Sequence, residues 1–303
     1  MKIFVLAPRE NWICDRIYQE WLENCSEITT QDPREASVLW LLAGWCWRHI
    51  PVDLLISKKV VVTVHHIVPE KFTKEKHADF LQRDQFTNAY HVPNAKTAAL
   101  LGQITKKPIY ILSYWYDKKK WSPLDRKESR KNIGLEQDKF VIGSFQRDTE
   151  GSDLKTPKLE KGPDRFCNLV SRIKDKDIHV LLGGWRRQYV ISRLQSENIP
   201  FTYIELADLE TLRTMYGACD LYVIASRYEG GPQSCLEASA MRVPIVSSDV
   251  GIVSNILSKN CIIDVDKDLY YPTLEDIDIG YEQVQNFEIK SYKQNYISLF
   301  RQV

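Results

Sequence analysis

The sequence predicts an α/β protein with two doubly wound parallel sheets. In both halves of the 303-residue chain, short apolar runs rich in β-branched residues alternate with helix-like segments. This alternation is typical of consecutive βαβ units. The length suits two ordinary domains, and an apolar content of 44% is that of a packed globular protein. We therefore expect two domains, each with its own sheet.

The first domain is expected over residues 1–115. Its predicted strands are the apolar runs at 2–7, 37–42, 60–64 and 108–112, and its predicted helices lie at 12–25 and 94–104. Residues 116–138 follow, which are rich in charge and hold little strand pattern. We interpret this segment as the linker between the domains.

The second domain is expected over residues 139–285. Its predicted strands are the runs at 140–145, 178–184, 200–205, 221–226, 243–248 and 261–265. A C-terminal helix over 286–303 is expected to pack back toward the first domain. Open α/β sheets bind ligands outside the carboxyl ends of their strands, so a cleft between two such sheets is the predicted ligand site.

Composition excludes several classes of protein. The 41 Lys and Arg residues balance 40 Asp and Glu residues, which gives no electrostatic argument for a nucleic-acid partner. The seven cysteines are scattered without a C-x-x-C pair and are expected to be reduced thiols of a cytoplasmic protein. The longest apolar run, 38–47, is too short to span a bilayer, which takes about 20 residues. Tryptophans beside cations at 41–51 and 114–121 leave peripheral membrane contact open, with burial as the alternative. The oligomeric state is not predicted.

The segment 226–240, SRYEGGPQSCLEASA, carries the chemistry of the second half. A buried strand ends before it, two glycines form a tight turn, and a helix is expected to start at Pro232. The free N–H groups at such a helix start favour an anion, phosphate above all. The residues that would present this site are Gly230, Gly231, Pro232, Gln233 and Ser234.

Glu229 and Glu237 lie on either side of this turn. A carboxylate accepts two hydroxyl hydrogen bonds at once and so suits a ribose or a sugar ring. Two carboxylates flanking an anion site would hold a nucleotide-diphosphate sugar. The alternative is that Glu229 is a favourable charge near a helix start and Glu237 is solvated surface.

Residues 220–257 resemble the signature segment of the retaining GT-B glycosyltransferases of the "group 1" family, with its E-x7-E motif. Arg242 replaces the usual glycine before Val-Pro, and Gly251 stands where the family often has two glycines. The resemblance is weak over the first half. It implies two Rossmann-like domains facing each other across a cleft.

The resemblance also implies roles for the donor-site residues. Glu229 would contact sugar hydroxyls as a catalytic residue, Glu237 would hold the ribose, and Lys161 with Arg147 would neutralise the leaving diphosphate. Trp185 would cover a base or sugar, or would pack against a neighbouring helix. Further candidates are Gly183 and Gly184 at the end of one strand, and Glu205 and Leu206 for base contacts.

In the first half, residues 60–69 resemble the family's strand ending in Thr-x-His. This implies that His65 positions the transferred sugar rather than acting as a base, with His66 as the nearest rival. The family's glycine-rich loop after the first strand is missing. In its place stand Arg9, Asn11 and Trp12, which are candidate acceptor contacts unless the acceptor itself is unusual.

We therefore expect a retaining hexosyltransferase of polysaccharide biosynthesis. It would use a nucleotide-diphosphate sugar as co-substrate and a hydroxyl of a glycan, glycolipid or glycoprotein as acceptor, without cofactor or metal, because fixed cations would neutralise the diphosphate. Two alternatives remain: a non-catalytic nucleotide-sugar-binding protein of the same fold, and a nucleotide-sugar epimerase of related fold.

Overall fold

The computed structural model describes residues 1–10 and 13–303. The chain forms two units, Met1–Asp117 with Glu288–Val303, and Lys118–Phe287. Each unit holds one five-stranded sheet, and every neighbouring pair of strands in it runs parallel. The two parallel α/β sheets predicted from the sequence are thus confirmed.

The first sheet has the order β1-β2-β3-β4-β5. Its strands are β1 (Ile3–Leu6), β2 (Val38–Leu41), β3 (Lys59–Thr63), β4 (Ala89–Val92) and β5 (Ile109–Ile111). The helices of this unit are α1 (Ile13–Cys25), α2 (Val52–Ser57), α3 (Lys74–Asp84), α4 (Ala95–Leu101) and α11 (Ile289–Gln302), with short 3-10 turns η1 (Ser26–Ile28), η2 (Gly44–His49) and η3 (Pro69–Lys71). The sequence pattern does not predict β4, because His91 interrupts its apolar run.

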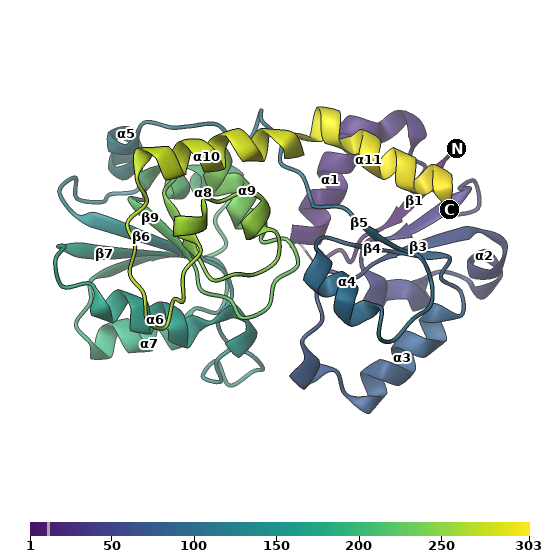
Figure 1. The fold of residues 1–303 in the computed structure, drawn as a ribbon, viewed down its shortest axis with the longest axis horizontal. Helices are drawn as coiled ribbons and strands as arrows, with labels where there is room; N and C mark the ends of the chain where they lie inside the picture. Colours follow the sequence, from purple (N-terminus) through teal and green to yellow (C-terminus); the bar gives the residue numbers. More distant parts are fainter. Residues whose placement is uncertain (11–12) are drawn as a thin grey trace. The chain divides into compact units, whose positions relative to one another are not determined.

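The direction in which the chain adds strands to the first sheet reverses at β1. Thr29 forms an isolated parallel bridge with Ile3, and the Thr30 N–H donates to the Ile3 carbonyl at 2.9 Å. The chain therefore leaves β1, adds this short stretch beside it, and then places β2 against β1 as well. Figure 1 shows α1 and α11 on one face of the sheet and α3 and α4 on the other. The point between β1 and β2 is thus a topological switch point.

The second sheet has the order β10-β9-β6-β7-β8. Its strands are β6 (Phe140–Phe145), β7 (Ile178–Gly183), β8 (Phe201–Ile204), β9 (Leu221–Ile224) and β10 (Ile245–Ser247). Its helices are α5 (Arg126–Asn132), α6 (Pro163–Arg172), α7 (Gln188–Ser196), α8 (Leu209–Ala218), α9 (Gln233–Ala240) and α10 (Leu274–Val284), with 3-10 turns η4 (Leu159–Lys161), η5 (Val253–Asn255), η6 (Lys259–Cys261) and η7 (Gln285–Phe287).

Helices cover both faces of the second sheet, with α8, α9 and α10 on one side and α6 and α7 on the other (Figure 1). The strands run outward from β6 to β7 and β8, and the chain then returns to add β9 on the opposite side of β6. The switch point of this unit therefore lies between β6 and β9. Ligands of open α/β sheets bind at such points.

Two segments differ from the sequence prediction. Residues 261–265 are not a strand: they make one bridge, between Ser247 and Ile262, and contribute Val265 to the core. The linker was expected over 116–138, and its residues from Lys118 on lie within the second unit. There the buried Arg130 on α5 donates to the Ala218 carbonyl at 3.1 Å.

The seven cysteines are buried free thiols. Among the helices that the structure describes, none combines the length and the apolarity that crossing a membrane requires.

Candidate functional site

Two segments run side by side at the switch point of the second sheet: 159–164, which leads into the first turn of α6, and 225–229, which follows β9. The N–H groups of Arg227 and Tyr228 both donate to the Glu160 carbonyl, at 2.9 and 3.1 Å. Gly162 has φ +63°, and a Cβ there would lie 2.0 Å from the Ala225 carbonyl oxygen. Only glycine permits so close an approach in this conformation.

Lys161 and Glu229, both predicted site residues, meet across these segments. Lys161 Nζ lies 2.6 Å from Glu229 Oε1, and the Ser226 hydroxyl donates to the same oxygen at 2.8 Å. The two side chains are 22% and 11% exposed. An ammonium and a carboxylate in contact near the surface can each turn to a ligand, the first to an oxyanion and the second to a hydroxyl group.

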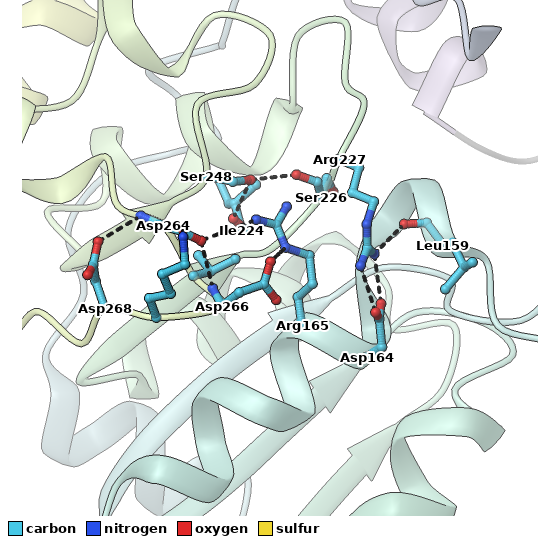
Figure 2. Close-up of polar contacts among 12 residues, drawn as sticks. Leu159, Asp164, Arg165, Ile224, Ser226, Arg227, Ser248, Asp264, Asp266 and Asp268 are labelled. Atoms are coloured by element: carbon cyan, nitrogen blue, oxygen red, sulfur yellow. Dashed lines mark hydrogen bonds and ion pairs between the residues drawn. The ribbon is translucent and has the colours of Figure 1, made fainter. Parts of the chain in front are cut away.

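Arg227 connects the two segments, as Figure 2 shows. Its guanidinium donates to both carboxylate oxygens of Asp164, at 2.8 and 2.7 Å, and to the Leu159 carbonyl at 3.0 Å. The hydrogen bonds with Asp164 raise the pKa of Arg227. The sequence prediction missed this pair. The only local signals were a basic residue two positions before Glu229 and an acidic one in the first turn of a helix.

Helix α9 begins at Gln233, with Pro232 as its N-cap residue, one position later than predicted. Gly251, at φ +56°, approaches the turn so closely that a Cβ would lie 2.4 Å from the Gly230 carbonyl oxygen. Gly251 therefore packs directly against the backbone of the Gly230–Gly231 turn. Gln233 is buried, and Ser234 in the first turn is half-buried.

Glu237 is 3% exposed and accepts a hydrogen bond of 2.9 Å from the Tyr216 hydroxyl on α8. The interpretation of Glu237 as solvated surface is therefore wrong. Burying a carboxylate is costly unless it is hydrogen-bonded, so the phenol is part of what keeps it there. Tyr216 was not predicted, because it lies 21 residues away in the chain.

Arg147 and Trp185, predicted separately, lie together at the ends of β6 and β7. The Arg147 guanidinium carbon is 5.3 Å from the Trp185 ring centroid, and that of Arg186 is 4.2 Å away. Trp185 is 38% exposed. Gly184 has φ +95°, and a Cβ there would lie 2.8 Å from the Gln146 carbonyl oxygen.

Arg187 is a buried residue that the sequence analysis missed. Its Nε donates to Asp148 at 2.9 Å, and its Nη1 donates to the Gly183 carbonyl at 2.7 Å and to the Ser144 carbonyl. Burial raises the pKa of Asp148, and the charge of Arg187 opposes that shift. This pair joins the loop after β6 to the loop after β7. It therefore holds the backbone around Arg147 and Trp185.

Glu205 and Leu206, the candidates for base contacts, are exposed at the end of β8. In the sheet order, β8 is separated from β6 by β7. Leu206 has φ +49°, which is unusual for a residue with a side chain. The structure leaves both residues apart from the Lys161 and Glu229 pair.

In the first unit, His65 lies two residues after the end of β3, and its described hydrogen bonds are to neutral groups. The Leu42 carbonyl, 2.9 Å from Nε2, can only accept, which assigns a proton to Nε2. Nδ1 then faces the Tyr114 hydroxyl at 2.5 Å. The Cys14 sulfur lies 3.6 Å from Nε2, and burial raises the pKa of that thiol to about 12. This arrangement favours positioning over proton transfer.

The other first-unit candidates are less defined. The backbone N–H of Arg9 donates to the Asp15 carboxylate at 2.9 Å, and Arg9 has φ +58°. His66 is half-buried. Asn11 and Trp12 lie outside the described residues. Within residues 1–10 and 13–303, no group of three or more His, Cys, Asp or Glu side chains is arranged to hold a metal.

Comparison with known proteins supports the family that the motif indicated. Residues 154–269 match the family model described as "Glycosyl transferases group 1". The lipopolysaccharide core biosynthesis mannosyltransferase LpsB of Rhizobium meliloti (strain 1021) is 27% identical over 172 residues, which cover 54% of this chain and 46% of the relative. The O-antigen biosynthesis glycosyltransferase WbnH of Escherichia coli is 25% identical over 200 residues, 60% of this chain and 57% of the relative.

The chain thus spans about half the length of the curated relatives it matches. Among solved structures, Anabaena HepE in complex with UDP and glucose superposes with a TM-score of 0.76 at 12% identity, covering 100% of both chains. This likeness supports the predicted fold class, two Rossmann-like domains of the GT-B type.

Proposed function

We propose that the protein is a retaining glycosyltransferase that moves a hexose-type sugar from a nucleotide-diphosphate sugar to a hydroxyl of a glycan, glycolipid or glycoprotein. The observation that carries this proposal is the contact of Lys161 Nζ with Glu229 Oε1 at the switch point of the second sheet. A cation and a carboxylate at that point match the two parts of such a donor, an anionic diphosphate and a sugar rich in hydroxyl groups.

The donor site would extend from this pair along α9. Lys161 and Arg147 bind the diphosphate, and Glu229 accepts hydrogen bonds from the sugar. The first turn of α9 contributes its N–H groups to the anion. Glu237, oriented by the Tyr216 hydroxyl at 2.9 Å, holds the ribose. The names of LpsB, a mannosyltransferase, and of HepE with UDP and glucose support a hexose donor.

The reaction places its largest charge change on the diphosphate. The bond from the anomeric carbon to the β-phosphate oxygen breaks, and its electron pair stays on that oxygen. The acceptor oxygen forms the new bond on the same face of the sugar and gives its proton to the leaving phosphate. Fixed cations stabilise the growing charge most in the transition state. Neither a metal nor a cofactor takes part in this proposal.

His65 of the first unit would position a sugar hydroxyl. With Nε2 donating to the Leu42 carbonyl and Nδ1 facing the Tyr114 hydroxyl, the ring is held in one orientation. Arg9, Asn11, Trp12 and His66 stay candidates for acceptor contacts.

The test is transfer from a panel of nucleotide sugars to glycan and glycolipid acceptors, with the anomeric configuration of the product read by NMR. We expect acceptor-dependent release of nucleotide and a retained configuration. A protein that binds a nucleotide sugar but never releases nucleotide would be the non-catalytic alternative. Conversion of the donor without any acceptor would indicate the epimerase.

A further inference from the structure

Two arginines share one tryptophan at the end of β7. The guanidinium carbon of Arg186 lies 4.2 Å from the Trp185 ring centroid, and that of Arg147 lies 5.3 Å away. Both arginines are half-buried, and Trp185 keeps part of its surface in solvent. Stacking on an aromatic ring holds a guanidinium in place and leaves the N–H groups at its edge able to bind a ligand.

Neither guanidinium forms an ion pair within the described residues. Over residues 1–10 and 13–303, no carboxylate lies within ion-pair distance of Arg147 or Arg186, and their described hydrogen bonds go to the carbonyls of Thr149 and Gly151. Burial, and then the charge of Arg186, lower the pKa of Arg147, which Glu160 offsets only in part. Two like charges kept close without a counterion favour the binding of an anion.

The backbone holds this arrangement against local strain. Arg186 has φ +58°, a conformation that residues with side chains rarely adopt. Its carbonyl accepts hydrogen bonds from the Asp148 N–H and the Thr149 hydroxyl, both at 3.2 Å. Strained residues persist when their surroundings over-determine them, and they cluster at binding sites.

Arg242 provides an internal comparison within the same unit. It also has φ +58°, and its guanidinium carbon lies 4.9 Å from the Tyr281 ring centroid. Arg242, however, forms an ion pair with Asp278. The backbone conformation and the aromatic contact are therefore shared by the two arginines, and the missing carboxylate distinguishes Arg186.

We propose that Arg186 and Arg147 form a two-arginine oxyanion subsite, supported by Trp185, that binds the diphosphate of the nucleotide. Arg186 is the added member of this subsite. The inference rests on the proposed function, because it assumes that a nucleotide-diphosphate sugar occupies the edge of the second sheet. Guanidinium groups present forked donors that match phosphate oxygens, so the pair would add to the single charge of Lys161.

The test is calorimetric titration of the whole chain with UDP, GDP, ADP, the matching nucleosides and inorganic pyrophosphate. Arg186→Gly removes the cation and suits the positive φ. Arg186→Gln keeps the backbone strain and part of the stem but removes the charge. Both variants should lose about tenfold in affinity for the best nucleoside diphosphate. Their affinity for the nucleoside should change by less than about twofold, and pyrophosphate should follow the diphosphate.

Arg242→Gly is the matched control and should leave every affinity unchanged, with circular dichroism confirming that each variant is folded. Diphosphate affinity equal to wild type in both Arg186 variants would overturn the inference alone. An equal loss of affinity for the nucleoside and the nucleoside diphosphate in the Arg186 variants would also overturn the inference alone. A wild-type chain that binds neither the nucleotides nor pyrophosphate would overturn the proposed function together with the inference.

Discussion

Both units hold a five-stranded parallel sheet, but the two sheets differ in strand order and present different chemistry at their carboxyl edges. In the second unit, the switch point between β6 and β9 carries the ion pair of Lys161 and Glu229. In the first unit, His65 lies two residues after the end of β3, and its described partners are a carbonyl, a phenol and a thiol. The described contacts of Lys161 thus include a carboxylate, whereas those of His65 are to neutral groups.

This difference indicates how the work of the proposed reaction is divided. Charge develops on the leaving diphosphate, so ionic groups stabilise the transition state most at the edge that binds it. A sugar or acceptor hydroxyl carries no net charge, and a neutral, oriented hydrogen-bonding group suffices to position it. Substitutions at the second edge should therefore reduce transfer far more than substitutions at the first.

The largest effect is expected from Glu229→Gln. The amide keeps the size of the side chain but removes the charge that faces Lys161, so transfer should fall about 100- to 1000-fold. The nucleotide dissociation constant should change much less. Initial rates and calorimetric titration measure the two quantities. Unchanged turnover would remove Glu229 from the site.

Gly162→Ala should disrupt the same edge through the backbone. A Cβ at this position would lie 2.0 Å from the Ala225 carbonyl oxygen, so segments 159–164 and 225–229 must separate. We expect a loss of about 3 kcal/mol in the free energy of unfolding, together with loss of transfer.

Gly134→Ala is the control for that substitution. Gly134 has a similar φ of +70° but nothing within 4 Å of a built Cβ. Only the strain of about 1–2 kcal/mol should remain, with transfer intact. Chemical denaturation compares the two variants, and equal losses would show that the close approach to Ala225 is unimportant.

Lys161→Ala should weaken binding of diphosphate donors by about 10- to 100-fold, since one charge-assisted hydrogen bond contributes roughly 1.5–3 kcal/mol. Binding of the free nucleoside should stay near wild type. Titration with both ligands checks this difference. Equal weakening of the two would mean that the lysine acts only on the structure, through Glu229.

The smallest effect is expected at the neutral edge. In His65→Gln, the amide can still donate to the Leu42 carbonyl and accept from the Tyr114 hydroxyl, so transfer should fall only about three- to tenfold, the size of one weakened neutral hydrogen bond. Steady-state kinetics with a fixed acceptor measures it. A loss beyond about a hundredfold would make His65 a catalytic base and would remove the contrast between the edges.

The sequence predicted the sheets well where apolar runs are unbroken. It missed β4, because His91 sits inside that strand as a buried imidazole that contacts the Thr63 hydroxyl and the Leu112 carbonyl. Burial lowers the pKa of His91 to about 4, so the ring is neutral and tolerated in the core. It wrongly predicted a strand at 261–265, where apolarity reflects packing of a loop against the core.

The candidate site likewise contains residues that the sequence predicts and residues that it does not. The residues near the turn, Glu229 and Glu237, and the cation Lys161 follow from local patterns and a family resemblance. The supporting pairs do not: Arg227 with Asp164 joins residues 63 apart, and Arg187 with Asp148 joins residues 39 apart. Such partners depend on which strands become neighbours, and no short motif encodes that.

Both proposals require that a nucleotide-diphosphate sugar binds at the carboxyl edge of the second sheet. A thermal-shift screen first identifies the nucleotide sugar that most raises the melting temperature. Amide hydrogen exchange is then measured with and without that ligand. Binding at this edge should slow exchange in residues 159–162, 184–187 and 226–236. Protection confined to the first unit, or none in these three segments at saturating ligand, would contradict it.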